Sequence, residues 1–157
     1  MRRQNSEINT SFISEAGSEL KNNDYFGFVE LDKFACYVIA DGIDDIQEAE
    51  SAKLAIKSII TKFEESPSLS WNAMYSYIYY ANRELLNSNS RNKLKASVTI
   101  VVTNYVKMRY ACAGNTRLRF YRENTLKFKS EDMSLAQDMV NDDVIPKDKL
   151  AMHEERN

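Results

Sequence analysis

The sequence predicts one α+β domain built on largely antiparallel sheets. Its 157 residues, 43% of them hydrophobic and 28% charged, suit a single globular domain with a real core. The expected elements come in the order of three strands, two helices and then strands again, so strands and helices are segregated along the chain. No internal repeat, linker or low-complexity block divides residues 1–157.

The first three expected strands lie in residues 8–14, 25–31 and 34–40. The short turn Asp32-Lys33 joins the second strand to the third, which predicts a hairpin. Residues 34–40 are almost wholly apolar, as in an inner strand that is covered on both faces.

This hairpin places two acidic residues at one of its ends. Asp24 precedes its first strand and Asp41 follows its second, and such positions are neighbours in an antiparallel pair. Asp41-Gly42 offers a side-chain oxygen and an approachable main-chain oxygen to a hard cation, with Mg²⁺ or Mn²⁺ favoured over zinc. Two bland alternatives stay open: Asp41 caps a strand-to-helix turn, or both acids are solvated loop residues.

Two adjacent helices that cover a sheet are expected next. Asp45 followed by Glu48 has the spacing of a capping box, so Asp44-Asp45 is interpreted as a helix start rather than as extra metal ligands. Apolar residues then recur at three- and four-residue steps until Pro67 ends the segment. A second helix begins near residue 68 or 70 and precedes the polar tract 87–92.

Strands return in residues 96–103 and 108–113. Gly114-Asn115 predicts a tight turn into a strand at 116–121, and a polar turn then leads to a strand at 126–128. Residues 132–142 and 146–152 have the pattern of short helices.

Composition excludes several classes of function. The net charge is -2 and the basic residues are interspersed with acids, which argues against nucleic-acid binding and against an anionic membrane surface. No apolar run is long enough to cross a bilayer and residues 1–4 lead into no secretion signal, so we expect a cytoplasmic protein. Cys36 and Cys112 lie in apolar strand patterns without metal-binding spacing, which predicts buried free thiols.

Five short motifs in series carry a family resemblance. Residues 22–24, Asn-Asn-Asp, are similar to an Asn-Glu-Asp motif, and residues 38–42, Val-Ile-Ala-Asp-Gly, to Val-Ala-Asp-Gly. This second motif continues in Glu50-Ser51-Ala52, which resembles an Ala-Ser helix. Residues 96–99, Ala-Ser-Val-Thr, are similar to a strand that begins Gly-Ser-Thr.

The remaining two motifs complete the series. Residues 113–117, Ala-Gly-Asn-Thr-Arg, resemble Gly-Asp-Ser-Arg in a turn. Residues from Asp132 through Ser134-Leu135 and Ile145-Pro146 to 153–157 resemble a segment that runs from Asp-His-Ser-Leu to His-Pro-x-Arg-Asn. Together the motifs resemble the metal-dependent protein phosphatases (PPM) of the protein phosphatase 2C type, in their bacterial form.

The resemblance implies a sandwich of antiparallel β-sheets flanked by antiparallel α-helices. It also implies a signalling enzyme that hydrolyses phosphoserine and phosphothreonine on phosphoprotein substrates. Asp41 would bridge two Mg²⁺ or Mn²⁺ ions, the Gly42 carbonyl would join one of them, and Asp24 would hold metal-bound water. Two such ions lower the pKa of water and neutralise charge on a phosphoryl oxygen, so the reaction needs no protein nucleophile.

Several positions depart from the family pattern. The metal-binding glutamate falls on Asn23, whose amide coordinates a metal without charge. The arginine that contacts the substrate phosphate falls on Glu19, and Lys21 is a stand-in without the bidentate fork of arginine. Asn115 replaces the aspartate of Gly-Asp-Ser-Arg, and Asp44-Asp45-Ile46 stands where bacterial members often carry Gly-Gly-His.

The family domain also extends further than this sequence, with a Ser-Asp-Gly segment and another metal-binding aspartate. We therefore expect residues 1–157 to be the N-terminal part of the domain, with an incomplete two-metal site, little activity alone and exposed sheet edges that permit self-association. The parent protein is expected to be a metal-dependent protein serine/threonine phosphatase. The alternatives are a pseudophosphatase that acts as a binding or regulatory module, and an unrelated α+β domain.

Overall fold

A four-stranded antiparallel sheet organises the chain, with its strands in the order β1-β2-β3-β4. The computed structural model describes residues 7–16, 21–43, 50–88, 94–131, 133 and 135–152. The four strands are β1 (Asp24–Glu30), β2 (Ala35–Gly42), β3 (Ala96–Thr103) and β4 (Met108–Ala113). The predictions for these strands and for the α+β class are confirmed.

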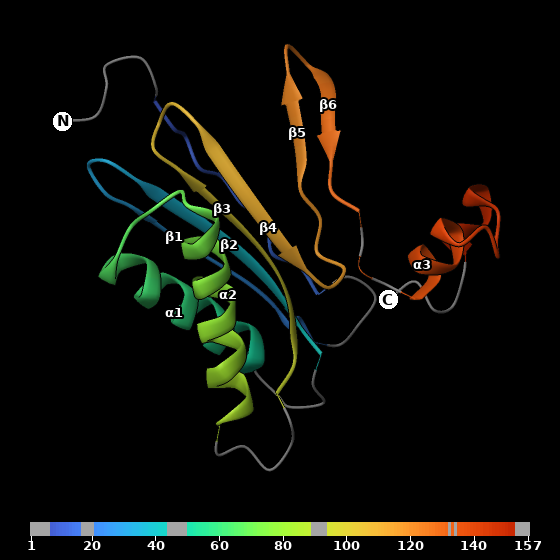
Figure 1. Ribbon diagram of the computed structural model, residues 1–157, viewed down its shortest axis with the longest axis horizontal. Helices are drawn as coiled ribbons and strands as arrows, with labels where there is room; N and C mark the ends of the chain where they lie inside the picture. Colours follow the sequence, from blue (N-terminus) through green and yellow to red (C-terminus); the bar gives the residue numbers. More distant parts are fainter. Residues whose placement is uncertain are drawn as a thin grey trace.

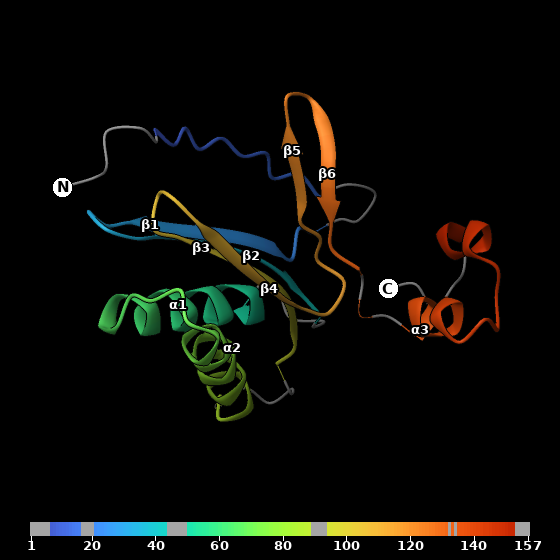
Figure 2. The same cartoon turned by 45° about the horizontal axis from the view of Figure 1, so that its top comes forward.

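Two helices, α1 (Glu50–Glu65) and α2 (Trp71–Leu86), cover one face of this sheet (Figure 1). Figure 2 shows both helices on the same side of β1 to β4. Their apolar residues recur at three- and four-residue steps, so one stripe of each helix is buried. The stripes and the facing strand residues form the core, which includes Ala52, Ala55, Ile56, Ile59, Phe63, Met74, Tyr77, Ala81, Val38, Ile100 and Val102.

The connection between the helices is tied down by one buried tyrosine. The Tyr77 hydroxyl donates to the Ser66 carbonyl oxygen at 2.7 Å and accepts from the Ser68 amide at 3.0 Å. Ser70 caps α2, because its Oγ accepts from the Ala73 amide at 3.1 Å. The predicted start of the second helix is therefore confirmed.

A separate two-stranded sheet consists of β5 (Arg119–Arg122) and β6 (Thr125–Lys129). Its tight turn uses positive φ angles at Glu123 and Asn124, 51° and 57°, as hairpin turns with the twist of paired strands require. The hairpin stands on the side of the large sheet that faces away from α1 and α2 (Figure 2). Tyr110 of β4 contacts the hairpin, because its ring centroid lies 5.0 Å from that of Phe128.

The expected strand at 116–121 is confirmed only for residues 119–121, and the expectation that it follows β4 directly through a tight turn is wrong. The chain leaves the large sheet after Ala113, and β5 begins only at Arg119 and pairs with β6 instead. Thr116 makes no ladder bond to β4 and instead contacts the Thr99 hydroxyl, through both its own hydroxyl and its carbonyl oxygen. The strand partner of β5, β6, then lies further along the chain.

Residues 8–14 form no strand, which also corrects the prediction. The segment is extended and crosses the sheet face opposite the helices, where the Phe12 ring lies 4.0 Å from that of Phe26, centroid to centroid. A strand needs a neighbour that supplies ladder hydrogen bonds, and within the described residues this segment pairs with none. Two of its apolar side chains are exposed, Phe12 at 63% and Ile13 at 87%.

The inner strand is fully covered on one face only, contrary to expectation. Cys36, Val38 and Ala40 of β2 are buried beneath the helices, whereas Ile39 on the other face is 46% exposed. Both cysteines are free as predicted, although Cys112 is only partly buried. Self-association through the exposed edges stays a prediction.

The last described elements are α3 (Leu135–Asn141) and the 3₁₀ helix η1 (Lys147–Met152), which agree with the two predicted short helices. Both lie away from the large sheet in Figure 1. Among the described residues, none of the helices has the length and hydropathy needed to cross a bilayer.

Some predicted features lie outside the described residues. These are Glu19, the cap at Asp44-Asp45 with Glu48 and Ile46, the motif positions Asp132 and Ser134, and the terminal motif at 153–157.

Candidate active site

An acidic pair lies where β1 begins and β2 ends. Asp24 and Asp41 are direct partners in the antiparallel ladder, so both side chains leave the sheet on the same face. Ser97 of β3 is the next partner of Asp41. The prediction that the two acids are neighbours is confirmed, and it follows from the short Asp32-Lys33 turn that sets the hairpin register.

The backbone around the pair is held by local hydrogen bonds. The Asp24 amide donates to Asn22 Oδ1 at 2.9 Å, and Asn22 Nδ2 donates to Ser14 Oγ at 2.8 Å. The Gly42 amide donates to the Asn23 carbonyl oxygen at 3.1 Å. Pairing therefore continues past the acids, and β2 reaches Gly42 rather than ending before Asp41.

Glycine at position 42 allows α1 to approach this end of the sheet. A Cβ at this position would lie 2.7 Å from Ser51 Oγ and 3.1 Å from the Asn23 carbonyl oxygen, closer than such contacts normally allow. Ser51 itself is fully buried in the first turn of α1. The absence of a side chain at Gly42 thus sets the distance between the helix and the acidic pair.

The pKa of Asp41 is raised. Burial of the carboxyl is the largest cause, followed by the charge of Asp24 and a hydrogen bond between the two side chains. A cation bound between the carboxylates would offset both their mutual repulsion and the cost of burying the charge of Asp41. This arrangement therefore favours a positively charged ligand.

A cleft of about 310 Å³ opens beside the acids. It is lined by Asp24, by residues 39–41 at the end of β2, and by the loop from Asn115 to Arg117. The loop leaves β4 through Gly114, whose φ is +92°, a conformation that side chains with a Cβ rarely adopt. Ser97 fills the space that a Cβ on Gly114 would need.

Side chains of β3 hold this loop in place. Thr99 Oγ1 lies 2.9 Å from Thr116 Oγ1 and 3.2 Å from the Thr116 carbonyl oxygen. The Asn115 amide donates to Ser97 Oγ at 3.3 Å. Two consecutive loop residues are therefore fixed to the strand that also pairs with Asp41.

The structure brings together some of the predicted site residues and not others. Asp24, Asp41 and Gly42 are adjacent, and Asn23 lies beside them, half-buried. Lys21 is exposed and is not among the residues that line the acidic cleft.

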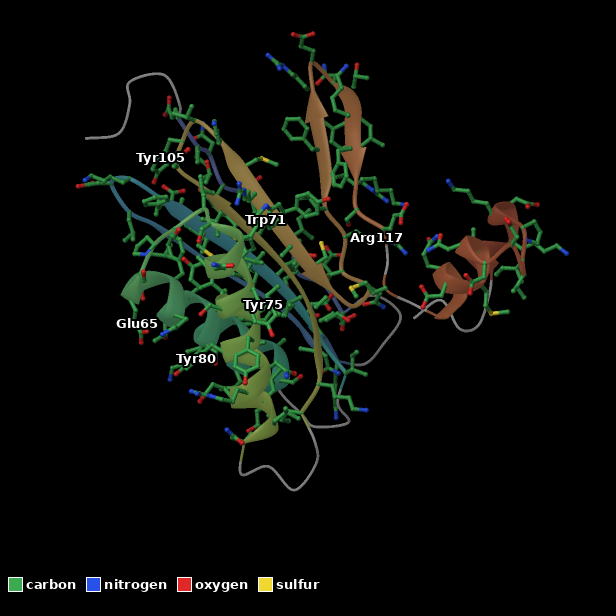
Figure 3. All side chains as sticks on the ribbon, in the orientation of Figure 1. Glu65, Trp71, Tyr75, Tyr80, Tyr105 and Arg117 are labelled. Carbon is green, nitrogen blue, oxygen red and sulfur yellow. The ribbon has the colours of Figure 1, made fainter. Side chains whose placement is uncertain are left out.

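Sequence reasoning missed one basic residue of the cleft, Arg117 (Figure 3). The signal was present in the Asn-Thr-Arg turn, which was assigned to a motif without a role for its arginine.

The donor set fits a hard cation only in part. Asp24 and Asp41 supply carboxylate oxygens, the ligands that Mg²⁺ and Mn²⁺ prefer. Within the described residues, however, no group of three or more acidic, histidine or cysteine side chains gathers around a common point. The described part of the site therefore supplies two carboxylates of a metal-binding set.

Comparison with solved structures identifies the architecture. The serine/threonine phosphatase of S. agalactiae superposes with a TM-score of 0.78 at 15% sequence identity, over 92% of this chain and 64% of the other. The PPM Ser-Thr phosphatase MsPP of Mycobacterium smegmatis, in complex with cacodylate, gives a TM-score of 0.73 at 17% identity, over 92% and 62% of the two chains. The chain has the fold of the PPM Ser/Thr phosphatases.

Staphylococcus aureus Stp1 shares the PPM fold as well, with a TM-score of 0.75 at 14% identity over 93% of this chain and 62% of that protein. The chain thus spans less than two thirds of the length of these PPM structures. No family model matches the sequence, and no curated protein matches it. The PPM resemblance expected from the motifs is confirmed at the level of fold.

Proposed function

We propose that the protein is a metal-dependent protein serine/threonine phosphatase, with Asp24 and Asp41 as its catalytic metal-binding acids. The observation that carries the proposal is the pairing of these two residues across the β1–β2 ladder, at the mouth of a cleft, in a PPM fold. A phosphoprotein substrate and a cytoplasmic setting are part of this proposal.

Asp24, Asp41, the Gly42 carbonyl and the Asn23 amide are the groups that would hold Mg²⁺ or Mn²⁺. When bound, the ions would generate hydroxide from water near neutral pH and neutralise charge on the phosphoryl oxygens. The protein itself fixes the two carboxylates through the ladder, and the Gly42–Asn23 hydrogen bond fixes the main chain beside them. Asn23 contributes no charge, so one of the two ions should bind weakly.

Titration of the protein with Mn²⁺, followed by calorimetry, tests the site. We expect binding by the wild-type chain and its loss in Asp41→Asn. Asp32→Asn is the matched control, because Asp32 lies in the turn at the far end of the same hairpin. The proposal fails if Mn²⁺ binds equally to the wild type and to Asp41→Asn.

Hydrolysis of p-nitrophenyl phosphate by the full-length gene product and by its Asp41→Ala variant, with and without Mn²⁺, tests catalysis. Turnover that requires Mn²⁺ and disappears in Asp41→Ala would support the phosphatase. Mn²⁺ binding without any turnover would instead favour the second candidate, a pseudophosphatase that serves as a binding or regulatory module. That candidate is supported by the uncharged Asn23 and by the small number of acids that gather in the described part of the site.

A further inference from the structure

Arg117 lines the acidic cleft together with Asp24 and Asp41, and hydrogen bonds of the residues before and after it hold its backbone. The residue is half-buried. On one side of it, Thr116 is bound to Thr99 of β3. On the other side, the Leu118 amide donates to Ser130 Oγ and the Ser130 amide donates to the Leu118 carbonyl oxygen, both at 2.9 Å.

These contacts pin the chain immediately before and immediately after Arg117. An arginine on a fixed backbone loses less conformational entropy when it binds a ligand than one on a mobile loop. Its guanidinium presents a planar fork of N–H donors, which matches two oxygens of a phosphate. The loop therefore holds an arginine, an anion-binding residue, on a fixed stretch of backbone in the lining of the cleft.

We propose that Arg117 binds the phosphate group of the substrate, the role that sequence reasoning gave to Lys21. This inference rests on the proposed phosphatase function and specifies its substrate-binding side. Asp24 and Asp41 would bind the cations, and Arg117 would bind oxygens of a phosphate monoester in the cleft. Lys21 is exposed and does not line this cleft, so it is poorly placed for the same task.

Binding of inorganic phosphate to the whole chain tests the proposal without any need for turnover. Isothermal calorimetry gives the affinity in the presence of Mn²⁺, and NMR of the arginine Nε–Hε groups gives the site of contact. We expect the Arg117 Nε–Hε signal to shift on addition of phosphate. We also expect Arg117→Gln to weaken phosphate binding about tenfold or more, as loss of a charge-assisted bidentate pair does.

Three further variants make the result specific. Arg117→Lys keeps the charge without the fork, and it should recover part of the affinity. Arg119→Gln removes an equal charge two positions along the chain, and Lys21→Gln removes the rival cation, so both should bind phosphate like the wild type. The melting temperature of each variant is measured alongside, and Arg117→Lys together with the wild-type NMR shift decides the matter if Arg117→Gln fails to fold.

The proposal is overturned if phosphate does not bind, if it binds without shifting the Arg117 signal, or if a folded Arg117→Gln binds it as tightly as the wild type. A larger loss in Lys21→Gln than in Arg117→Gln overturns it too. Failure of the phosphatase proposal looks different, because the Mn²⁺ titration of Asp41→Asn would then match that of the wild type. The two ideas can therefore fail independently.

Discussion

The Thr99 and Thr116 hydroxyl oxygens lie 2.9 Å apart and tie the central strand β3 to the loop that carries Arg117. Thr99 is also the ladder partner of Ile39, two residues before Asp41. The Thr99 side chain thus connects the strand beside Asp41 to the loop that carries Arg117.

Replacement of Thr99 by valine should loosen this loop and leave the fold intact. Valine keeps the shape and removes the hydroxyl, so we expect a loss of about 1 kcal/mol in the free energy of unfolding and a severalfold weaker affinity for inorganic phosphate. Urea denaturation and calorimetry measure the two effects.

Thr103→Val is the control for this prediction. Thr103 Oγ1 donates to the Lys107 carbonyl oxygen at 3.0 Å and accepts from the Tyr105 amide at 2.9 Å, at the far end of the same strand. We expect Thr103→Val to lower the free energy of unfolding by a similar amount and to leave the affinity for inorganic phosphate unchanged. Equal phosphate affinities for wild type and Thr99→Val would contradict the coupling.

Neutralising Asp41 should stabilise the metal-free protein at neutral pH. The folded state binds the Asp41 proton more tightly than the unfolded chain does, because the pKa is raised. The stability that this protonation contributes is therefore complete below the unfolded pKa and is lost as pH rises through the folded pKa. Since Asp41 is only half-buried, we expect Asp41→Asn to raise the melting temperature by no more than roughly 1–2 °C at neutral pH.

Scanning calorimetry at neutral pH and at about pH 3 checks the sign. The difference in melting temperature between Asp41→Asn and the wild type should vanish at the lower pH, where the wild-type carboxyl is itself neutral. Added Mn²⁺ should make the wild type the more stable of the two proteins, because only the wild type binds the ion. An Asp41→Asn variant that is less stable than the wild type in metal-free buffer at neutral pH contradicts the account.

A side chain at position 42 should collide with α1. We expect Gly42→Ala to cost about 1–3 kcal/mol in the free energy of unfolding, because its Cβ would meet Ser51 Oγ at 2.7 Å. Ser51→Ala alone should be neutral or stabilising, since the buried hydroxyl has no hydrogen-bond partner among the described residues.

The double variant should recover part of the loss, and a double-mutant cycle from urea denaturation measures the coupling. Strict additivity of the two single effects would mean that Ser51 does not set the clearance at Gly42.

Loss of the α2 cap should destabilise the helical layer. Ser70→Ala removes the acceptor of the Ala73 amide and should cost about 1 kcal/mol. Asn72→Ala, on the exposed side of the first turn, is the control and should cost less. Thermal unfolding followed by circular dichroism distinguishes them, and equal melting temperatures for Ser70→Ala and the wild type would rule out the cap.

Local patterns were enough to predict the large sheet and both covering helices. The alternation of apolar residues in 96–103 and the three- and four-residue steps after Glu50 each specify one element almost to the residue. The acidic pair was predictable for the same reason, because a short turn leaves only one register for the hairpin that carries Asp24 and Asp41.

The errors arose where long-range contacts decide the structure. Residues 8–14 have the composition of a strand, but pairing depends on a neighbour that no local pattern supplies. The segment after Gly114 was expected to turn back along β4, and the Thr99–Thr116 contact across the sheet directs it elsewhere. The place of Arg117 in the cleft depends on that contact, and the Asn-Thr-Arg motif alone was not enough to assign its arginine a role.

The reciprocal hydrogen bonds between Leu118 and Ser130 close the base of the β5–β6 hairpin. Everything from Arg119 to Lys129 lies beyond this closure, and its strands have exposed side chains on both faces. Such a tip can change in length or sequence while its anchor, and with it the cleft, stays fixed. The hairpin is therefore a natural grafting point, where a new recognition segment can be installed beside the acidic pair without rebuilding it.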